Sequence, residues 1–153
     1  MTRIWTNAPR RLERIYQTHA FPVYFVTAVT ARRQPFLANE TVHQALVAYA
    51  RGNVPHGRAM GRYAIMPDHI HFMVRLHPEA RLSDYVRMLK QRITLAIRHP
   101  DYTWQPGFFD RLLRTSERTA HAWQYMVDNP MEAGLARTPD DWPYQGEIEP
   151  IRF

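Results

Sequence analysis

The chain has 153 residues, of which 45% are hydrophobic, a size that matches one ordinary domain with its own core. It contains no cysteine, which excludes disulfides, thiolate metal sites and cysteine nucleophiles. The formal net charge is +6, and Lys90 is the only lysine among 20 basic residues. Arginine forks suit phosphate oxygens and stack on bases, so this composition favours a nucleic-acid partner.

The hydropathy of the chain and its first residues indicate where in the cell the protein is expected. No run of about 18 apolar residues occurs, so no membrane span is predicted. The first residues, MTRIWTNAPRR, lack an apolar signal core, and a cytoplasmic protein is expected. Residues 1–20 carry Arg3, Arg10, Arg11 and Arg14 and predict a basic arm along a phosphate backbone, with a frayed terminus as the alternative.

The first half of the chain predicts three strands and one helix. Residues 23–30, VYFVTAVT, are rich in β-branched and aromatic side chains and predict a strand. Asn39 is a good N-cap for a helix that Gly52 ends. Residues 58–66 and 69–75 predict two strands, joined at Pro67-Asp68 by a tight turn or a bulge.

The second half predicts a further strand between two helices. Ser83 is expected to cap a helix that closes at His99-Pro100, and residues 108–114 predict a fourth strand. Thr115 or Ser116 caps a last helix, which Asn129-Pro130 should end or kink. Residues 138–153 predict an irregular tail.

This order of elements predicts the fold class. It gives an α+β protein, with a ferredoxin-like βαββαβ antiparallel sheet and helices on one face. A C-terminal helix that bears Tyr125 follows, and the whole chain, residues 1–153, is expected to form one domain. The other sheet face is then available for a ligand, a partner or the last helix.

Two histidines stand one residue apart in the apolar run Met66-Pro67-Asp68-His69-Ile70-His71-Phe72. In a strand, His69 and His71 point to one face and Ile70 to the other. Two imidazoles on one face make up most of a small metal site. The alternative is a pair of packing histidines.

Tyr125 and Asn129 are four residues apart on the predicted last helix and therefore share a face. Two imidazoles and one amide oxygen can hold Mg²⁺ or Mn²⁺ with open positions for a phosphate oxygen. Tyrosine can act as a nucleophile that leaves a covalent intermediate. The alternatives are a core aromatic for Tyr125 and a helix C-cap for Asn129.

These residues resemble a known family. Met66-Pro67-Asp68-His69-Ile70-His71 is similar to the His-hydrophobic-His motif of HUH single-tyrosine transposases. The stretch from Tyr125 to Leu135 resembles their tyrosine helix, in the Tyr-x-x-x-Asn-Pro-x-x-Ala-Gly-Leu form of REP-associated tyrosine transposases. Residues 23–37 and 104–114 are similar to other blocks of the same family.

The resemblance implies an enzyme that cuts and rejoins single-stranded DNA near hairpins of the REP type, in transposition or recombination. By position, Tyr125 is the nucleophile that forms a 5′-phosphotyrosine link. His69, His71 and Asn129 are the ligands of a divalent metal, Mg²⁺ or Mn²⁺. Asn129 stands where relatives from mobile elements have glutamine. The protein is expected to act as a monomer or a homodimer.

Four basic residues are expected to contact DNA: Arg32, Arg33, Lys90 and Arg114. The alternative for each is a charged side chain that only meets solvent.

Three other functions compete with this interpretation. A histidine-triad hydrolase needs a third histidine where this strand has Met73. A non-catalytic nucleic-acid-binding module on a ferredoxin-like sheet explains the charge but not the set of His69, His71, Tyr125 and Asn129. A metal-dependent hydrolase that uses only water would leave no covalent adduct with DNA.

Overall fold

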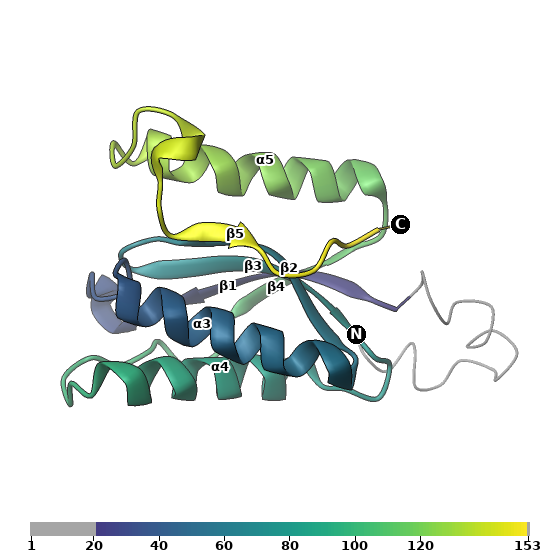
Figure 1. Cartoon of the computed structure of the whole chain (residues 1–153), viewed down its shortest axis with the longest axis horizontal. Helices are drawn as coiled ribbons and strands as arrows, with labels where there is room; N and C mark the ends of the chain where they lie inside the picture. The colour runs from purple at the N-terminus through teal and green to yellow at the C-terminus, as the bar shows by residue number, and fades with distance from the viewer. Residues whose placement is uncertain (1–20, 153) are drawn as a thin grey trace, which may run out of the picture.

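The computed structural model of the chain describes residues 21–152, so the predicted basic arm lies outside the described residues. Its centre is a five-stranded antiparallel sheet with the strand order β4-β1-β3-β2-β5 (Figure 1). The strands are β1 (Val23–Val29), β2 (Arg58–Ile65), β3 (His69–Leu76), β4 (Phe109–Leu113) and β5 (Gln145–Glu147).

Helices lie on both faces of this sheet. Helices α3 (Glu40–Asn53) and α4 (Leu82–Ile97) cover one face, and α5 (Ser116–Glu132) lies across the other (Figure 1). Short 3-10 turns at Ala31–Arg33, Val54–His56 and Pro139–Asp141 complete the connections. The strand and helix order through β4 is βαββαβ, and the predicted α+β ferredoxin-like fold with an additional tyrosine-bearing helix is confirmed. Among the described residues, no helix combines the length and the apolar character that crossing a bilayer requires.

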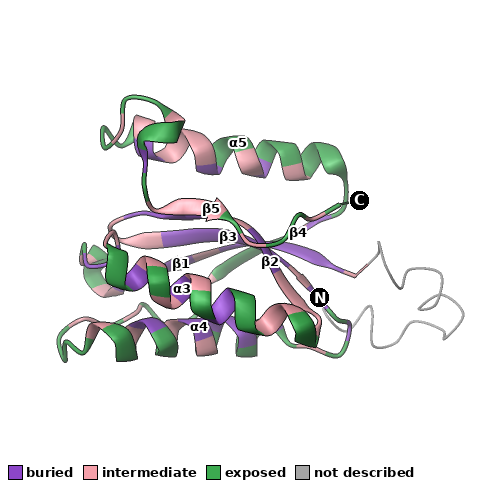
Figure 2. Cartoon of the chain, in the orientation of Figure 1, coloured by how far each residue is buried: buried purple, intermediate pink, exposed green. Residues whose placement is uncertain are grey.

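The main core lies between the sheet and the pair α3 and α4 (Figure 2). Alternate residues of β3, Ile70, Phe72 and Val74, are fully buried on this side, as the period of a strand requires. The two helices present their own apolar stripes, and Tyr49 on α3 donates its hydroxyl hydrogen to the Tyr85 carbonyl of α4 at 2.8 Å. This core therefore fixes which face every β3 side chain occupies.

A smaller apolar cluster lies under α5. It consists of Val23, Phe25, Ala64, Met73, Leu113, Ala122 and Met126. Figure 2 shows the outer side of α5 exposed and only a narrow stripe of it buried. The sheet face beneath α5 is therefore only partly filled, and the polar residues of β3 lie on it.

The β2–β3 hairpin has a two-residue turn at Pro67-Asp68, in which the Met66 N–H donates to the His69 carbonyl at 2.8 Å. The bulge considered for this step lies further back in β2, where the register shifts between Met60 and Tyr63. A side chain at Gly61 in this bulge would meet Ile151, because its Cβ would lie 2.6 Å from the Ile151 Cδ1 atom. The small size of glycine therefore leaves room for the Ile151 side chain where the C-terminal segment crosses β2.

Four local expectations differ from the structure. Helix α3 continues through Gly52 to Asn53, and the glycine with positive φ that ends this region is Gly57, after the 3-10 turn. Helix α4 begins at Leu82, so Ser83 lies inside its first turn, and the extended Arg81 precedes the helix without a side-chain cap. Helix α5 continues through Pro130 to Glu132, because a proline in the last turn removes only one backbone hydrogen bond. The tail is not wholly irregular, since Gln145–Glu147 pairs with the free edge of β2 as β5.

Replacing Ile70 with alanine tests the packing of β3. The side chain is fully buried, so Ile70→Ala should lower the free energy of unfolding by about 2–5 kcal/mol, measured by urea denaturation. The exposed Leu95 on α4 provides the control, and Leu95→Ala should change stability by less than about 0.5 kcal/mol. Equal effects of the two substitutions would contradict the assigned register.

Candidate active site

His69 and His71 lie side by side on the sheet face that α5 covers. Both belong to β3, and their ring centroids are 4.6 Å apart. Ile70 between them points into the opposite core. The strand period therefore places the two imidazoles together, as their spacing in the sequence predicted.

His71 is buried, with 3% of its surface exposed. Its Nδ1 lies 2.8 Å from the Thr27 hydroxyl on β1, and its ring stacks on Phe25 at a centroid distance of 5.4 Å. Burial first, and then the neighbouring His69, lower the pKa of His71 from 6.5 to about 3, while the Asn129 amide acts in the opposite direction. His71 is therefore neutral at physiological pH, with one ring nitrogen held by Thr27.

His69 is held at the hairpin turn by its neighbour in the sequence. Its Nδ1 lies 2.7 Å from Asp68 Oδ1, and Arg33 donates its Nε–H to the other Asp68 oxygen at 2.9 Å. The His69 ring and the Arg33 guanidinium lower the pKa of Asp68 against the effect of its own burial. A carboxylate in this place fixes the ring orientation of His69 and turns Nε2 toward α5.

Tyr125 and Asn129 come from α5, one helical turn apart. The Tyr125 ring is 5.3 Å from the His71 ring and meets the Phe25 edge at 6.4 Å, and 53% of its surface is exposed. Asn129 Oδ1 lies 3.0 Å from His69 Nε2. The four predicted site residues therefore meet within one chain, and the Tyr125 side chain remains half exposed to solvent.

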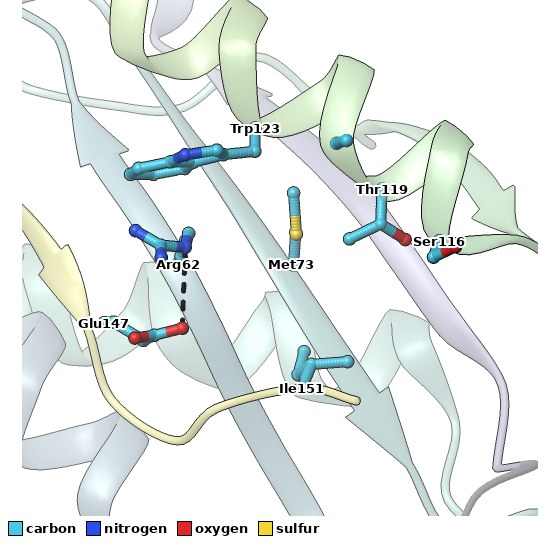
Figure 3. A pocket seen from close by; sticks show the side chains of 8 residues that line it. Arg62, Met73, Ser116, Thr119, Trp123, Glu147 and Ile151 are labelled. Carbon is cyan, nitrogen blue, oxygen red and sulfur yellow. Dashed lines mark ion pairs between the residues drawn. The ribbon is translucent and has the colours of Figure 1, made fainter. Parts of the chain in front are cut away.

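The position of α5 depends on a small number of contacts. The Arg62 guanidinium of β2 lies 3.7 Å from the ring centroid of Trp123, and its Nε is 3.5 Å from Glu147 of β5 (Figure 3). Beside this stack lies a hollow of about 280 Å³, lined by Arg62, Met73, Ser116, Thr119, Ala120, Trp123, Glu147 and Ile151. Because Trp123 precedes Tyr125 by two residues, the stack helps to fix the rotation of the helix that carries the phenol.

The atoms around the two imidazoles fit a divalent cation. If His69 donates its Nδ1–H to Asp68, then Nε2 and the facing Asn129 Oδ1 are both acceptors, and either a proton on Nε2 or a cation bound to both atoms satisfies them. Their separation of 3.0 Å equals that of adjacent ligands around an octahedral ion, for which metal–oxygen bonds of about 2.1 Å are typical. His71 Nε2 is buried and has no hydrogen-bond partner among residues 21–152, which makes it a third donor atom.

The set depends on the amide of Asn129. Within the described part of the chain, no group of three or more His, Cys, Asp or Glu side chains is placed to hold a metal. Two imidazoles and one amide oxygen leave half of an octahedron for water and phosphate oxygens.

The four basic candidates do not gather at one place. Arg32 and Arg33 follow β1 at the histidine end of the sheet, both with positive φ values of 53° and 57°. Arg114 is exposed after β4, near the start of α5. Lys90 lies on α4, on the opposite face, where its Nζ donates to the Gln105 and Gly107 carbonyls. Within residues 21–152, Arg32 and Arg114 have no ion pair or carbonyl contact of the kind that holds the other two.

Sequence reasoning missed the residues that orient the imidazoles. The sequence alone predicts only a turn at Asp68, although its place beside His69 is a usable signal. Thr27 and Phe25 are contacts across strands, and only the register of β1 with β3 reveals them. The sequence patterns therefore predicted the groups that do chemistry better than the groups that hold them.

A family model described as IS200-like transposase matches residues 19–125, which is more than half of the chain. The chain belongs to this transposase family. The match ends at Tyr125 and includes the strand that bears both histidines.

Curated relatives carry a more specific name. A REP-associated tyrosine transposase of Escherichia coli K12 is 26% identical to this transposase over 125 residues, which cover 79% of this chain and 73% of the relative. A Haemophilus influenzae protein, to which the same name is given provisionally, is 26% identical over 137 residues, or 80% of this chain and 77% of the relative. This transposase is accordingly an enzyme of the single-tyrosine class, and the alternative of a non-catalytic binding module is wrong.

A solved structure shares the fold. A REP-associated tyrosine transposase bound to a REP hairpin superposes with a TM-score of 0.70 at 21% identity, covering 82% of this chain and 76% of that one. This likeness confirms the fold of the transposase.

The depressed pKa of His71 predicts acid sensitivity of the metal-free transposase. The unfolded chain binds this proton near pH 6.5 and the folded protein only near pH 3, so stability falls as the pH drops between these values. The slope should reach about 1.4 kcal/mol per pH unit, measured by urea unfolding from pH 7 to pH 4. His71→Gln removes the titrating group and should flatten this slope; an unchanged slope would place the sensitivity elsewhere.

Proposed function

We propose that the chain is a metal-dependent endonuclease and strand transferase that cleaves and rejoins single-stranded DNA near REP-like hairpins through a 5′-phosphotyrosine intermediate. The observation that carries this proposal is the meeting of an exposed phenol with a histidine pair and an amide inside one chain. The family supplies the reaction class, DNA transposition, and the relative bound to a REP hairpin suggests the form of the DNA.

Each site residue has a role in the proposed reaction. Tyr125 attacks the phosphorus with its hydroxyl oxygen, the bond to the 3′ oxygen breaks, and the 5′ side stays on the tyrosine. The phenol proton passes to solvent, which reaches the half-exposed side chain, and the departing 3′ oxygen takes up a proton as it becomes a hydroxyl. Attack of a 3′-hydroxyl on the phosphotyrosine reverses these steps and rejoins the strand.

His69, His71 and Asn129 are the proposed ligands of Mg²⁺ or Mn²⁺. Such an ion supplies Lewis-acid polarisation of the phosphate and stabilises its developing charge. Thr27 and Asp68 keep the two rings in the orientation that leaves Nε2 facing the site. Burial keeps His71 neutral, so a proton does not compete for its nitrogen.

The same geometry supports proposals for the DNA path and the oligomeric state. Arg32 at the histidine end and Arg114 near the start of α5 are exposed and are proposed to contact phosphates. Arg33 is proposed to contact DNA while it keeps its ion pair to Asp68. A contact between Lys90 and DNA stays a prediction. Since Tyr125 lies against histidines of its own chain, we propose that one chain completes the site and that cleavage does not require a homodimer.

Replacing Tyr125 with phenylalanine tests the nucleophile. The variant should form no covalent adduct with hairpin DNA on a denaturing gel, because only the hydroxyl is lost. Its affinity for the same DNA should stay within about twofold, as for a surface change worth less than about 0.5 kcal/mol.

The matched control is Tyr102→Phe, whose ring stacks on Phe36 in the core and on His99. It should cleave normally. A Tyr125→Phe variant that still forms the adduct would assign the nucleophile to another residue, and metal-dependent cleavage without any adduct would favour a hydrolase that uses water.

Removing one imidazole tests the metal ligands. His71→Ala should lose the stimulation of cleavage by Mn²⁺ or Mg²⁺, because Nε2 of this ring is a proposed ligand. Asp68→Asn, which keeps all ligands but weakens the orientation of His69, should reduce metal affinity by about 10–100-fold. His56→Ala, an exposed histidine before β2, is the control. Unchanged metal dependence in His71→Ala would show that the imidazoles only pack.

A further inference from the structure

Among residues 21–152, strand β4 is an outer strand of the sheet, paired only with β1. Four large hydrophobic side chains are strongly exposed among residues 21–152, and two of them, Phe109 at 62% and Tyr125 at 53%, lie on the α5 side of the sheet. Leu95 and Leu135 are the other two. An exposed phenylalanine on the same side of the sheet as the exposed Tyr125 needs an explanation that scattered surface residues do not.

The strand register places Phe109 in the same cross-strand row as His71, with β1 between them. Thr27 of β1 pairs with Phe109 of β4 on one side and with His71 of β3 on the other. Residues directly opposite one another on paired strands share a face, with Cβ atoms about 5 Å apart. Phe109, Thr27 and His71 therefore form one row across the sheet, and Thr27 also holds the His71 ring.

Arg111 extends this row along β4 on the same face. It pairs with Phe25, and its guanidinium carbon lies 5.5 Å from the Phe25 ring, which itself stacks on His71. Arg111 is exposed and has no ion-pair partner within the described residues. Asp110 between Phe109 and Arg111 pairs with Val26, so it belongs to the opposite face and does not neutralise the guanidinium.

We propose that Phe109 and Arg111 form a rim that binds the single strand next to the scissile phosphate. Phe109 stacks on one unpaired base, and Arg111 binds a phosphate of the adjoining backbone. The two side chains are about 7 Å apart along the strand, so one stretch of DNA can meet both. This inference rests on the proposed function. It implies that the DNA approaches the site across the outer edge of β4.

The chemistry of the two side chains favours a nucleic acid over another occupant. Aromatic side chains stack on any base, and an adjacent arginine neutralises the charge of the phosphate backbone. This combination is usual in sites that bind single strands. A protein strand added to β4 would use backbone hydrogen bonds and would not depend on the ring of Phe109. The net charge of +6 also favours an anionic partner.

Binding experiments without cleavage test the rim. In a Tyr125→Phe background, Phe109→Ala should weaken binding of a hairpin DNA with a single-stranded flank by about tenfold, as loss of one base stack predicts. Phe109→Trp should bind as the parent does, because it keeps the aromatic face. Leu95→Ala, equally exposed but on α4, is the matched control and should have no effect.

Salt dependence isolates Arg111. Arg111→Ala should reduce the slope of log affinity against log salt by about 0.7, the value for one phosphate contact to a single strand. Arg51→Ala, an exposed arginine on α3, should leave the slope unchanged. The base that stacks on Phe109 is located by 2-aminopurine placed at successive flank positions, since its fluorescence should be quenched with Phe109 and restored with Phe109→Ala at one position.

The outcomes separate the rim from the proposed function. If the unmodified protein forms the Tyr125 adduct but Phe109→Ala binds DNA as tightly as Leu95→Ala, the rim is wrong and the function stands. If Phe109→Ala changes the sedimentation of the protein but not its DNA affinity, β4 is a protein interface and the rim is again wrong. If no adduct forms, the proposed function fails, and the binding series, which requires no cleavage, still decides the rim.

Discussion

The register of β3 is the constraint on which the site depends. Ile70, Phe72 and Val74 enter the core under α3 and α4, and this alone turns His69 and His71 toward α5. Each buried apolar side chain contributes about 1.5–3 kcal/mol, and a shift by one residue would exchange the two sets. The packing that stabilises the fold therefore also sets the arrangement of the proposed site.

The two imidazoles have different surroundings, and these surroundings suit different roles in the proposed site. His71 is enclosed by Phe25 and Thr27 and stays neutral, whereas His69 connects to the surface through Asp68 and Arg33. The Asn129 side chain extends this series of contacts from His69 to α5. The positions of the turn after β1, the hairpin and the tyrosine helix are thus coupled through polar side chains, and a disturbance at any one of them would reach the phenol.

Local patterns predicted much of this molecule. The alternation of residues 69–74, the N-cap at Asn39 and the start of α5 after Thr115 depend on near neighbours and were read correctly. Strand β5 was missed, because its pairing depends on the free edge of β2 and not on its own composition. For the same reason the environment of Phe109 was not predicted: the sequence contains the residue, but only the strand order shows that β4 is an open edge.

The C-terminal segment has a consequence for the solubility of the protein. Residues Gln145–Glu147 occupy the edge of β2, and Trp142 donates its indole N–H to the Ile65 carbonyl at the end of that strand. A chain cut before this segment would present the bare amide and carbonyl groups of β2, flanked by apolar side chains. Such an edge is a template for intermolecular β-pairing. Pairing of Gln145–Glu147 with β2 thus protects this edge of the sheet from aggregation.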